Sequence, residues 1–137
     1  MIEIEYTNNL DQINEKMLCG FFVGWLNPPS PSSHIKILKG SYCVWLAIDT
    51  ISKTVVGFIN AISDGILSAY IPIFEVLPEY QNIGIGKELL ARMLDSLKNL
   101  YMIDLLCDTE LQSYYAKFGM KNATGSFLRN FDRQSCK

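Results

Sequence analysis

Two glycines, Gly84 and Gly86, stand where an apolar run ends and an amphipathic segment begins. Glycine at a helix entry lets backbone N–H groups approach a ligand closely, and these groups have no partner inside the helix. The helix dipole adds positive potential at the same end. This combination is typical of an anion site suited to phosphate or pyrophosphate, and Lys87 could add charge. In the alternative interpretation, the two glycines only tighten the helix entry.

Two familiar phosphate-binding motifs do not match this turn. A dinucleotide fold requires a third glycine three residues after Gly86, where the chain has Leu89. A P-loop requires a glycine five residues before the Gly-Lys pair and a Ser or Thr after it. Those two positions hold Gln81 and Glu88. The turn is therefore a candidate anion site of another kind.

Glu75, in the apolar run before the turn, is the candidate general base. Period-two alternation would place it on the same side of a strand as Ile71, Ile73 and Leu77. A carboxylate on an otherwise apolar face is suited to accept a proton near neutral pH. The alternative is a carboxylate that is held by an Arg or Lys or that points to solvent.

His34 and Cys107 are the two other residues whose side chains could take part in catalysis or metal binding. His34 is the only histidine, so a Ser-His-Asp triad or a His-containing metal site would have to use it. It follows a stretch rich in proline and serine, which predicts a solvated loop residue. Cys107 lies near the end of an apolar run with no histidine in register, so we expect a core side chain. No metal site is expected.

The composition is that of a single globular domain spanning residues 1–137, with 49% hydrophobic and 19% charged residues. A net charge of −2 without a basic block argues against nucleic-acid binding. The N-terminus lacks the pattern of a signal peptide, and no apolar run approaches the length of a membrane span. The four cysteines are widely spaced, as is typical of reduced thiols. We therefore expect a cytoplasmic protein without membrane association.

Hydrophobic periodicity predicts an alternation of strands and helices around the turn. Strands are expected at 2–6, 42–49, 54–63, 66–77, 102–107 and, as a strand or hairpin, 121–131; helices are expected at 10–18, 86–99 and 109–118; and a loop is expected at 27–33. The segment 86–99 is long enough for a crossover between parallel strands. The pattern predicts an α+β domain with a mixed sheet and helices packed on it.

Two motifs in this order resemble the GNAT (GCN5-related N-acetyltransferase) superfamily. Its signature after the fourth strand is Arg/Gln-x-x-Gly-x-Gly/Ala, which Gln81, Gly84 and Gly86 match. The second signature places Asn at the end of the fifth strand, Tyr seven residues later, and a Gly-Phe pair after that. Here Asp108 replaces the Asn, Tyr115 is in register, and Gly119 is followed by Met120. Asn82 stands where glycine is common, and asparagine tolerates left-handed backbone.

This resemblance implies a mostly antiparallel sheet with helices on both faces, in a three-layer α/β/α arrangement. It implies direct transfer of the acetyl group of acetyl-CoA to an amine, without a covalent enzyme intermediate. Backbone near Val76 and Leu77 would bind pantetheine and polarise the acetyl carbonyl. Backbone from Gln81 to Lys87 would bind the pyrophosphate. The implied cofactor-binding residues are Val76, Leu77, Gln81, Asn82, Ile83, Gly84, Ile85, Gly86, Lys87, Asp108 and Tyr115.

Tyr115 matches the family tyrosine that protonates the leaving thiolate, which makes it the implied general acid beside Glu75 as base. A core aromatic residue is the alternative, and Tyr114 is the neighbour with which it could be confused. A water chain could take the place of Glu75. At Asp108, a carboxylate in place of the usual amide could repel the phosphates of CoA.

The nature of the acceptor amine is indicated by the segment from Leu18 to Ile48, which contains no Asp or Glu. The same segment holds an aromatic set, Phe21, Phe22, Trp25, Tyr42 and Trp45. An aromatic wall favours a small acceptor with an apolar body and one amine over a protein or a polyamine, unless these side chains are ordinary core. A non-catalytic acyl-CoA-binding module and a purely structural interaction domain remain alternatives, and a homodimer is compatible with the sequence.

Overall fold

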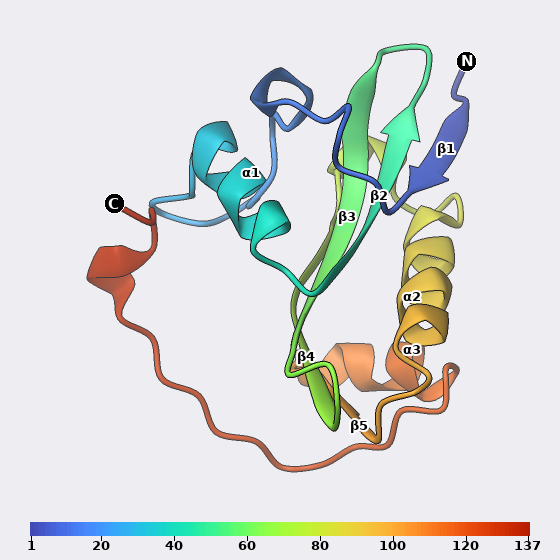
Figure 1. Cartoon of the computed structure of the whole chain (residues 1–137), viewed down its shortest axis with the longest axis vertical. Coiled ribbons are helices and arrows are strands. Elements are labelled where there is room, and N and C mark those ends of the chain that lie inside the picture. Colours follow the sequence, from blue (N-terminus) through green and yellow to red (C-terminus); the bar gives the residue numbers. More distant parts are fainter.

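A mixed sheet forms the centre of the protein, as the sequence predicts, and it contains five strands (Figure 1). The computed structural model describes all 137 residues. The strands are β1 (Ile4–Thr7), β2 (Cys43–Asp49), β3 (Thr54–Ser63), β4 (Ser68–Val76) and β5 (Met102–Asp104), and they lie in this order across the sheet. All neighbouring strands are antiparallel except β4 and β5, which are parallel. The parallel pair requires a crossover, and α2 (Ile85–Ser96) provides it.

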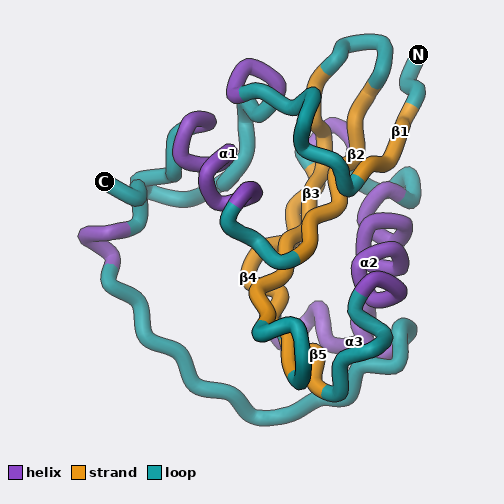
Figure 2. Tube along the Cα trace, in the orientation of Figure 1, coloured by secondary structure: helices purple, strands orange, loops and turns teal.

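Helices cover both faces of this sheet, which gives three layers (Figure 2). Helix α2 and the short helix α3 (Gln112–Ala116) pack on one face, where Leu89, Leu90 and Met93 of α2 are fully buried. Helix α1 (Pro31–Lys39) packs on the other face with Leu38 against Leu46 and Phe58. The predicted helical spacing of α2 is confirmed, because its buried residues recur every three or four positions.

A β-bulge in β4 decides which way the side chains of the strand point. Asn60 of β3 pairs with Ile73, but Ile62 pairs with Tyr70, so Ile71 and Pro72 together stand opposite one residue of β3. A bulge reverses the alternation of side chains beyond it. Accordingly Ile71 packs on the α2 side, whereas Ile73 packs on the α1 side. The expectation that Glu75 shares a face with Ile71 is therefore wrong.

The first 40 residues differ most from the predicted elements. In place of a helix over 10–18, the chain forms only a 3-10 turn at Glu15–Met17. The side chains of Asn9 and Asn14 each accept a hydrogen bond from the backbone N–H two residues on, at 2.9 Å and 3.0 Å. Such local bonds stabilise turns in competition with a helix.

Helix α1 occupies part of the segment predicted as a loop at 27–33. Pro31 takes the first helical position, where its missing N–H costs nothing, and Ser30 caps the helix by accepting a hydrogen bond from the Ser33 N–H at 3.1 Å. His34 is consequently not a solvated loop residue. It is 1% exposed among Phe21, Phe22 and Phe58, and burial lowers the pKa of His34 to about 4.

The chain after α2 contains less regular structure than predicted. Strand β5 ends at Asp104, and a 3-10 turn at Thr109–Leu111 precedes α3. The predicted strand or hairpin at 121–131 is absent. This segment has no regular structure before a 3-10 turn at Phe131–Arg133. It runs instead as an extended strap from the α3 side of the molecule to α1 (Figure 1). No helix in the structure is long and apolar enough to cross a membrane.

Candidate active site

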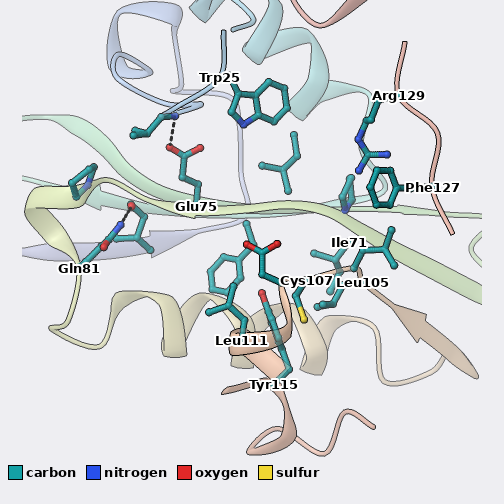
Figure 3. A pocket seen from close by; sticks show the side chains of 18 residues that line it. Trp25, Ile71, Glu75, Gln81, Leu105, Cys107, Leu111, Tyr115, Phe127 and Arg129 are labelled. Carbon is teal, nitrogen blue, oxygen red and sulfur yellow. Dashed lines mark hydrogen bonds between the residues drawn. The ribbon is translucent and has the colours of Figure 1, made fainter. Parts of the chain in front are cut away.

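A cleft opens where β4 and β5 part. The two strands pair only through Ser68–Tyr70 of β4 and Met102–Asp104 of β5, so the rest of β4 has a neighbour on one side alone. A cavity of about 840 Å³ lies beside this free edge (Figure 3). It is lined by Val23, Trp25, Ile71, Pro72, Ile73, Phe74, Glu75, Val76, Pro78, Gln81, Leu105, Leu106, Cys107, Asp108, Leu111, Tyr115, Phe127 and Arg129.

The backbone of β4 presents donors to this cleft. The Leu77 N–H donates to the Val56 carbonyl of β3 at 2.8 Å, so it is already engaged. Because N–H groups alternate between the two edges of a strand, the Val76 N–H points away from β3 and toward the cleft. The Val76 carbonyl accepts a hydrogen bond from Gln81 Nε2 at 2.9 Å, which ties the side chain of Gln81 to the end of β4. Of the Val76–Leu77 pair, Val76 therefore offers the free donor.

The turn from Gln81 to Lys87 leaves a row of N–H groups without partners in the chain. No backbone N–H of residues 82–87 donates a hydrogen bond, and the first one that does is Glu88, to the Gly84 carbonyl at 3.2 Å. Asn82 adopts the left-handed conformation with φ 66°, which asparagine tolerates better than most residues. Six free donors at the N-terminus of a twelve-residue helix form a site suited to an anion.

Gly84 and Gly86 serve this turn in different ways. Gly84 has φ 95° and open space where a Cβ would lie, so it supplies a left-handed backbone beside solvent. Gly86 lies beside side chains, because a Cβ there would be in ordinary van der Waals contact with Phe74 Cζ at 3.4 Å and the Tyr114 oxygen at 3.5 Å. The side chain of Ile85 is buried in the core, while Ile83 and Lys87 are exposed. At position 85, only the backbone can face a ligand.

The two tyrosines of α3 point to different places. Tyr115 lines the cavity, whereas the Tyr114 hydroxyl lies against Gly86 at the start of α2. Burial, with smaller contributions from Cys107 and Tyr114, raises the pKa of Tyr115 to about 12. The phenol therefore stays protonated at neutral pH and can donate a proton or a hydrogen bond. Asp108 also lines the cavity, before the 3-10 turn that leads into α3.

Glu75 lies across β4 from Tyr115, on the side of Trp25 (Figure 3). Its Oε1 accepts the Phe22 N–H at 2.9 Å, and its Oε2 accepts the Val23 N–H at 3.3 Å. Phe22 itself has a left-handed φ of 64°. The carboxylate thus fixes the loop that carries Trp25, and it forms no ion pair. Each oxygen keeps a second lone pair that can accept a proton.

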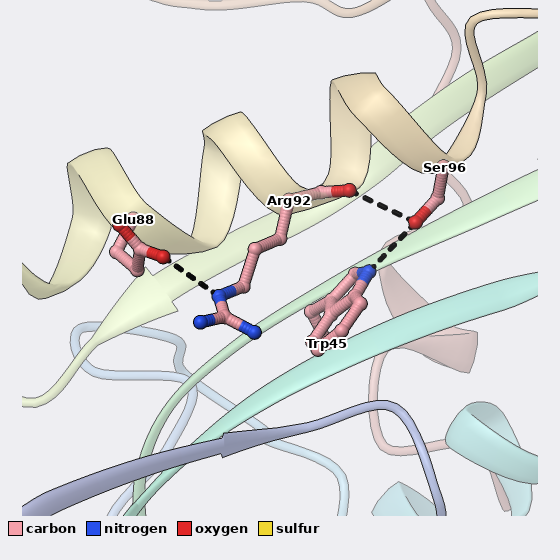
Figure 4. A network of polar contacts seen from close by, with 4 residues as sticks. All are labelled: Trp45, Glu88, Arg92 and Ser96. Atoms are coloured by element: carbon pink, nitrogen blue, oxygen red, sulfur yellow. Dashed lines mark hydrogen bonds and ion pairs between the residues drawn. The ribbon is translucent and has the colours of Figure 1, made fainter.

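Only one member of the predicted aromatic wall reaches the cavity. Trp25 lines it, but Phe21 and Phe22 pack around His34, and Tyr42 lies against Gly65. Trp45 lies on the α2 side of the sheet, where its Nε1 donates to Ser96 Oγ at 2.9 Å (Figure 4). The predicted five-residue wall is thus mostly core. The sequence places Trp45 in a predicted strand and Trp25 just before a predicted loop, but tertiary packing decides which of the two side chains reaches the cavity.

Three cavity residues were not anticipated from the sequence. Cys107, expected in the core, is only half-buried and lines the cavity beside Tyr115. Phe127 and Arg129 reach the cavity from the C-terminal strap (Figure 3). Arg129 lies over the Phe127 ring at 4.6 Å and forms no ion pair. No group of three or more His, Cys, Asp or Glu side chains is arranged to hold a metal ion.

The sequence and the structure of the chain were compared with those of known proteins, and both comparisons found acetyltransferases. A family model described as the acetyltransferase (GNAT) family matches residues 10–120. The Uncharacterized N-acetyltransferase ycf52 of Porphyra purpurea is 27% identical over 121 residues, which cover 86% of this chain and 69% of that protein. The crystal structure of a proposed acetyltransferase from Deinococcus radiodurans R1 has a TM-score of 0.93 at 41% identity, over 96% of this chain and 92% of that one.

A more distant structure shares the fold and was solved with a ligand. Aminoglycoside N-acetyltransferase AAC(6')-Iy in complex with CoA has a TM-score of 0.63 at 14% identity, over 95% of this chain and 94% of that one. The family match covers most of the residues described above, including the Gln81–Lys87 turn and Tyr115. The chain therefore belongs to the acetyltransferase (GNAT) family, whose members are acetyl-transferring enzymes.

Proposed function

We propose that the protein transfers the acetyl group of acetyl-CoA to a primary amine by direct attack in a ternary complex. The observation that carries this proposal is the continuity of one cleft. The cavity extends from Gln81, the residue before the free N–H groups of residues 82–87, along the unpaired edge of β4 to the phenol of Tyr115. An anion site, a strip of backbone donors and a proton donor in this order match the pyrophosphate, pantetheine and thioester of acetyl-CoA.

The cosubstrate contacts follow from which groups are free. The N–H groups at the start of α2 bind the pyrophosphate, and exposed Lys87 adds positive potential. Pantetheine lies along the free edge of β4, where the Val76 N–H polarises the acetyl carbonyl. The Leu77 N–H cannot bind pantetheine in the same way, because it already donates to the Val56 carbonyl. Leu77 therefore only continues the backbone of β4 beside the cosubstrate. Asp108 contacts the pantetheine end rather than the phosphates, because it lines the same cavity as Tyr115.

The chemical step then needs two proton transfers. The amine nitrogen attacks the thioester carbon, the C–S bond breaks, and the CoA thiolate takes a proton from the Tyr115 hydroxyl. The ammonium formed by the attack loses its proton to a free lone pair of Glu75, directly or through a water chain. Because Glu75 and Tyr115 approach the cavity from opposite faces of β4, the amine and the leaving thiolate have separate proton partners.

The acceptor is a small primary amine with an apolar body rather than a protein. Val23 and Trp25 line its side of the cavity, and the only carboxylate beside them, Glu75, already accepts two backbone N–H groups. Arg129 adds an unpaired positive charge there, which disfavours a polycation.

All four cysteines are free thiols, which supports a cytoplasmic location.

One observation favours a second candidate, a non-catalytic acyl-CoA-binding module. The two backbone hydrogen bonds of Glu75 give this carboxylate a structural role that would persist without catalysis. The two candidates separate in an experiment that measures both acetyl-CoA binding by calorimetry and release of free thiol with a panel of amines and peptides. Binding with amine-dependent thiol release supports the enzyme. Binding without release over the whole panel supports the module, and no binding contradicts both.

A further inference from the structure

The turn from Gln81 to Lys87 is anchored in the core only at its helical end. Ile85, which begins α2, is 3% exposed and belongs to the hydrophobic core. Residues 81–84 are all exposed, so no side chain of this half of the turn is buried. Asn82 and Gly84 have left-handed φ values of 66° and 95°, a conformation that is costly for a residue with a side chain. The arrangement of the free N–H groups therefore depends on what holds the residues before the turn.

One long-range hydrogen bond holds these residues. The Tyr80 hydroxyl donates to Asp49 Oδ2 at 2.8 Å. All other hydrogen bonds of residues 78–84 join positions that are at most five residues apart, including the bond from Gln81 to the Val76 carbonyl (Figure 3). The bond to Asp49 is thus the only hydrogen bond between this segment and a distant part of the chain.

Asp49 is a fixed acceptor. It ends β2 and is 3% exposed, although it carries a carboxylate and forms no ion pair. Its Oδ1 accepts the Ile51 N–H at 3.0 Å, and its own carbonyl accepts the Lys53 N–H at 2.8 Å, so the β2–β3 turn holds it from both sides. The hydrogen bond from Tyr80 is the main reason that the pKa of Asp49 lies below its ordinary value. The carboxylate is therefore charged at neutral pH and remains an acceptor.

Tyr80 connects this acceptor to the turn. It ends the 3-10 turn Pro78–Tyr80, directly before Gln81, and its ring packs against the core on the α2 side of the sheet. A tyrosine ring is rigid and has only two rotatable bonds, so a hydroxyl that is bound to Asp49 also restrains the backbone of Tyr80. We propose that Asp49 and Tyr80 are positioning residues that hold the free N–H groups of the turn in place before acetyl-CoA binds.

This inference rests on the proposed function, in which the N–H groups of residues 82–87 bind the pyrophosphate of acetyl-CoA. A site whose donors are arranged in advance binds more tightly, because less backbone freedom is lost on binding. Without the Tyr80 hydroxyl, part of the turn must be ordered by the cosubstrate itself. Ordering one residue again would weaken binding about 5- to 30-fold, which corresponds to about 1–2 kcal/mol.

Calorimetry with acetyl-CoA tests this loss in a matched pair of variants. Tyr80→Phe removes the hydroxyl and keeps the ring. Thr50→Val removes a neighbouring hydroxyl of the β2–β3 turn, which donates to the Glu3 carbonyl at 3.3 Å and not to the segment before α2. We expect the dissociation constant to rise at least fivefold in Tyr80→Phe and less than twofold in Thr50→Val. An unchanged affinity in Tyr80→Phe, or equal losses in the two variants, would overturn the proposal.

A double variant and the kinetic constants separate positioning from a merely structural role. If Asp49 and Tyr80 act through one bond, Asp49→Ala combined with Tyr80→Phe should bind acetyl-CoA within about twofold of the weaker single variant. The KM for acetyl-CoA should rise while the turnover number at saturation stays unchanged. Additive losses of affinity, or a lower turnover number with an unchanged KM, would contradict the proposal. The Tyr80→Phe result decides alone if Asp49→Ala does not fold.

Backbone order parameters from nuclear magnetic resonance test the positioning in the ligand-free protein. The amides of Asn82, Ile83 and Gly84 should have lower order parameters in Tyr80→Phe than in the wild type, with Ile85 unchanged. Equal order parameters in the two proteins would overturn the inference even where the wild type binds acetyl-CoA. A wild type without affinity for acetyl-CoA would instead contradict the proposed function. The two failures are distinguishable because the order parameters are measured without acetyl-CoA.

Discussion

Gly84→Ala provides a sharp test of the anion site, because the chain contains a matched control. Gly84 and Gly24 both have a left-handed φ, 95° and 83°, and a Cβ at either position meets no atom within 4 Å. Alanine should therefore cost each variant about 1–2 kcal/mol of stability through left-handed strain alone. Only Gly84 lies in the turn with free N–H groups, so only its variant should lose affinity for acetyl-CoA.

The size of the loss follows from the donors. A hydrogen bond to a charged group contributes about 1.5–3 kcal/mol, so displacing one N–H from the pyrophosphate should weaken binding about 10- to 150-fold. Isothermal calorimetry measures the affinity and thermal unfolding measures the stability. Unchanged affinity in Gly84→Ala would refute the phosphate site. An equal loss of affinity in Gly24→Ala would show that the effect reflects general destabilisation and not the turn.

Three further predictions concern side chains. Tyr115→Phe should lower the turnover number about 10²- to 10⁴-fold with little change in acetyl-CoA affinity, since it removes one proton donor and keeps the ring; steady-state kinetics beside Tyr114→Phe checks this, and a stronger effect at Tyr114 would contradict the assignment. Glu75→Gln should depress the rate most near neutral pH and least at high pH, where the amine is deprotonated in solution; a loss that is uniform across a pH profile would instead assign Glu75 a role in holding the Phe22–Val23 backbone. Burial holds the pKa of His34 at about 4, below its ordinary value of 6.5, so the unfolded chain binds more protons between these values and stability should fall as pH drops from 6.5 to 4. His34→Leu should remove up to about 3 kcal/mol of this pH dependence, as measured by chemical denaturation, and an unchanged pH profile would contradict the neutral buried state of His34.

The sequence predicts well the parts of the fold that depend on local patterns. Strand β3 has the predicted bounds, Thr54–Ser63, because its apolar run is bounded by turn residues on both sides. Helix α2 and its glycine turn follow from helical spacing and from the conformations that glycine and asparagine tolerate. These features can be predicted because residues that are close together in the sequence are enough to specify them.

Features that depend on distant parts of the chain could not be predicted in the same way. The bulge that opposes Ile71 and Pro72 to one residue of β3 is a property of a strand pair, so strict alternation misplaced Ile71 relative to Glu75. The binding of Glu75 to the Phe22 and Val23 N–H groups joins segments more than 50 residues apart. Trp25 lines the cavity, whereas Trp45 donates a hydrogen bond to Ser96 of α2, and both contacts join segments that are distant in sequence.

The two ends of the chain show why a correct pattern can still give a wrong element. Pro31 reads as a loop residue unless the serine before it is taken as a helix cap. The residues of 121–131 read as a strand, but no backbone N–H of this segment donates a hydrogen bond to a neighbouring strand, although Gly125 lies against the side chain of Leu106.

The central claim, acetyl transfer to an apolar amine, is tested most directly by a competition in one vessel. The enzyme is given acetyl-CoA with equal concentrations of an arylalkylamine and spermidine, and the products are identified by mass spectrometry. The cavity with Val23, Trp25 and Arg129 predicts that the N-acetylated arylalkylamine forms faster than acetylated spermidine. Acetylspermidine in tenfold excess would contradict the acceptor assignment, and acetyl-CoA that binds but remains intact with both amines would contradict acetyl transfer to either class of amine.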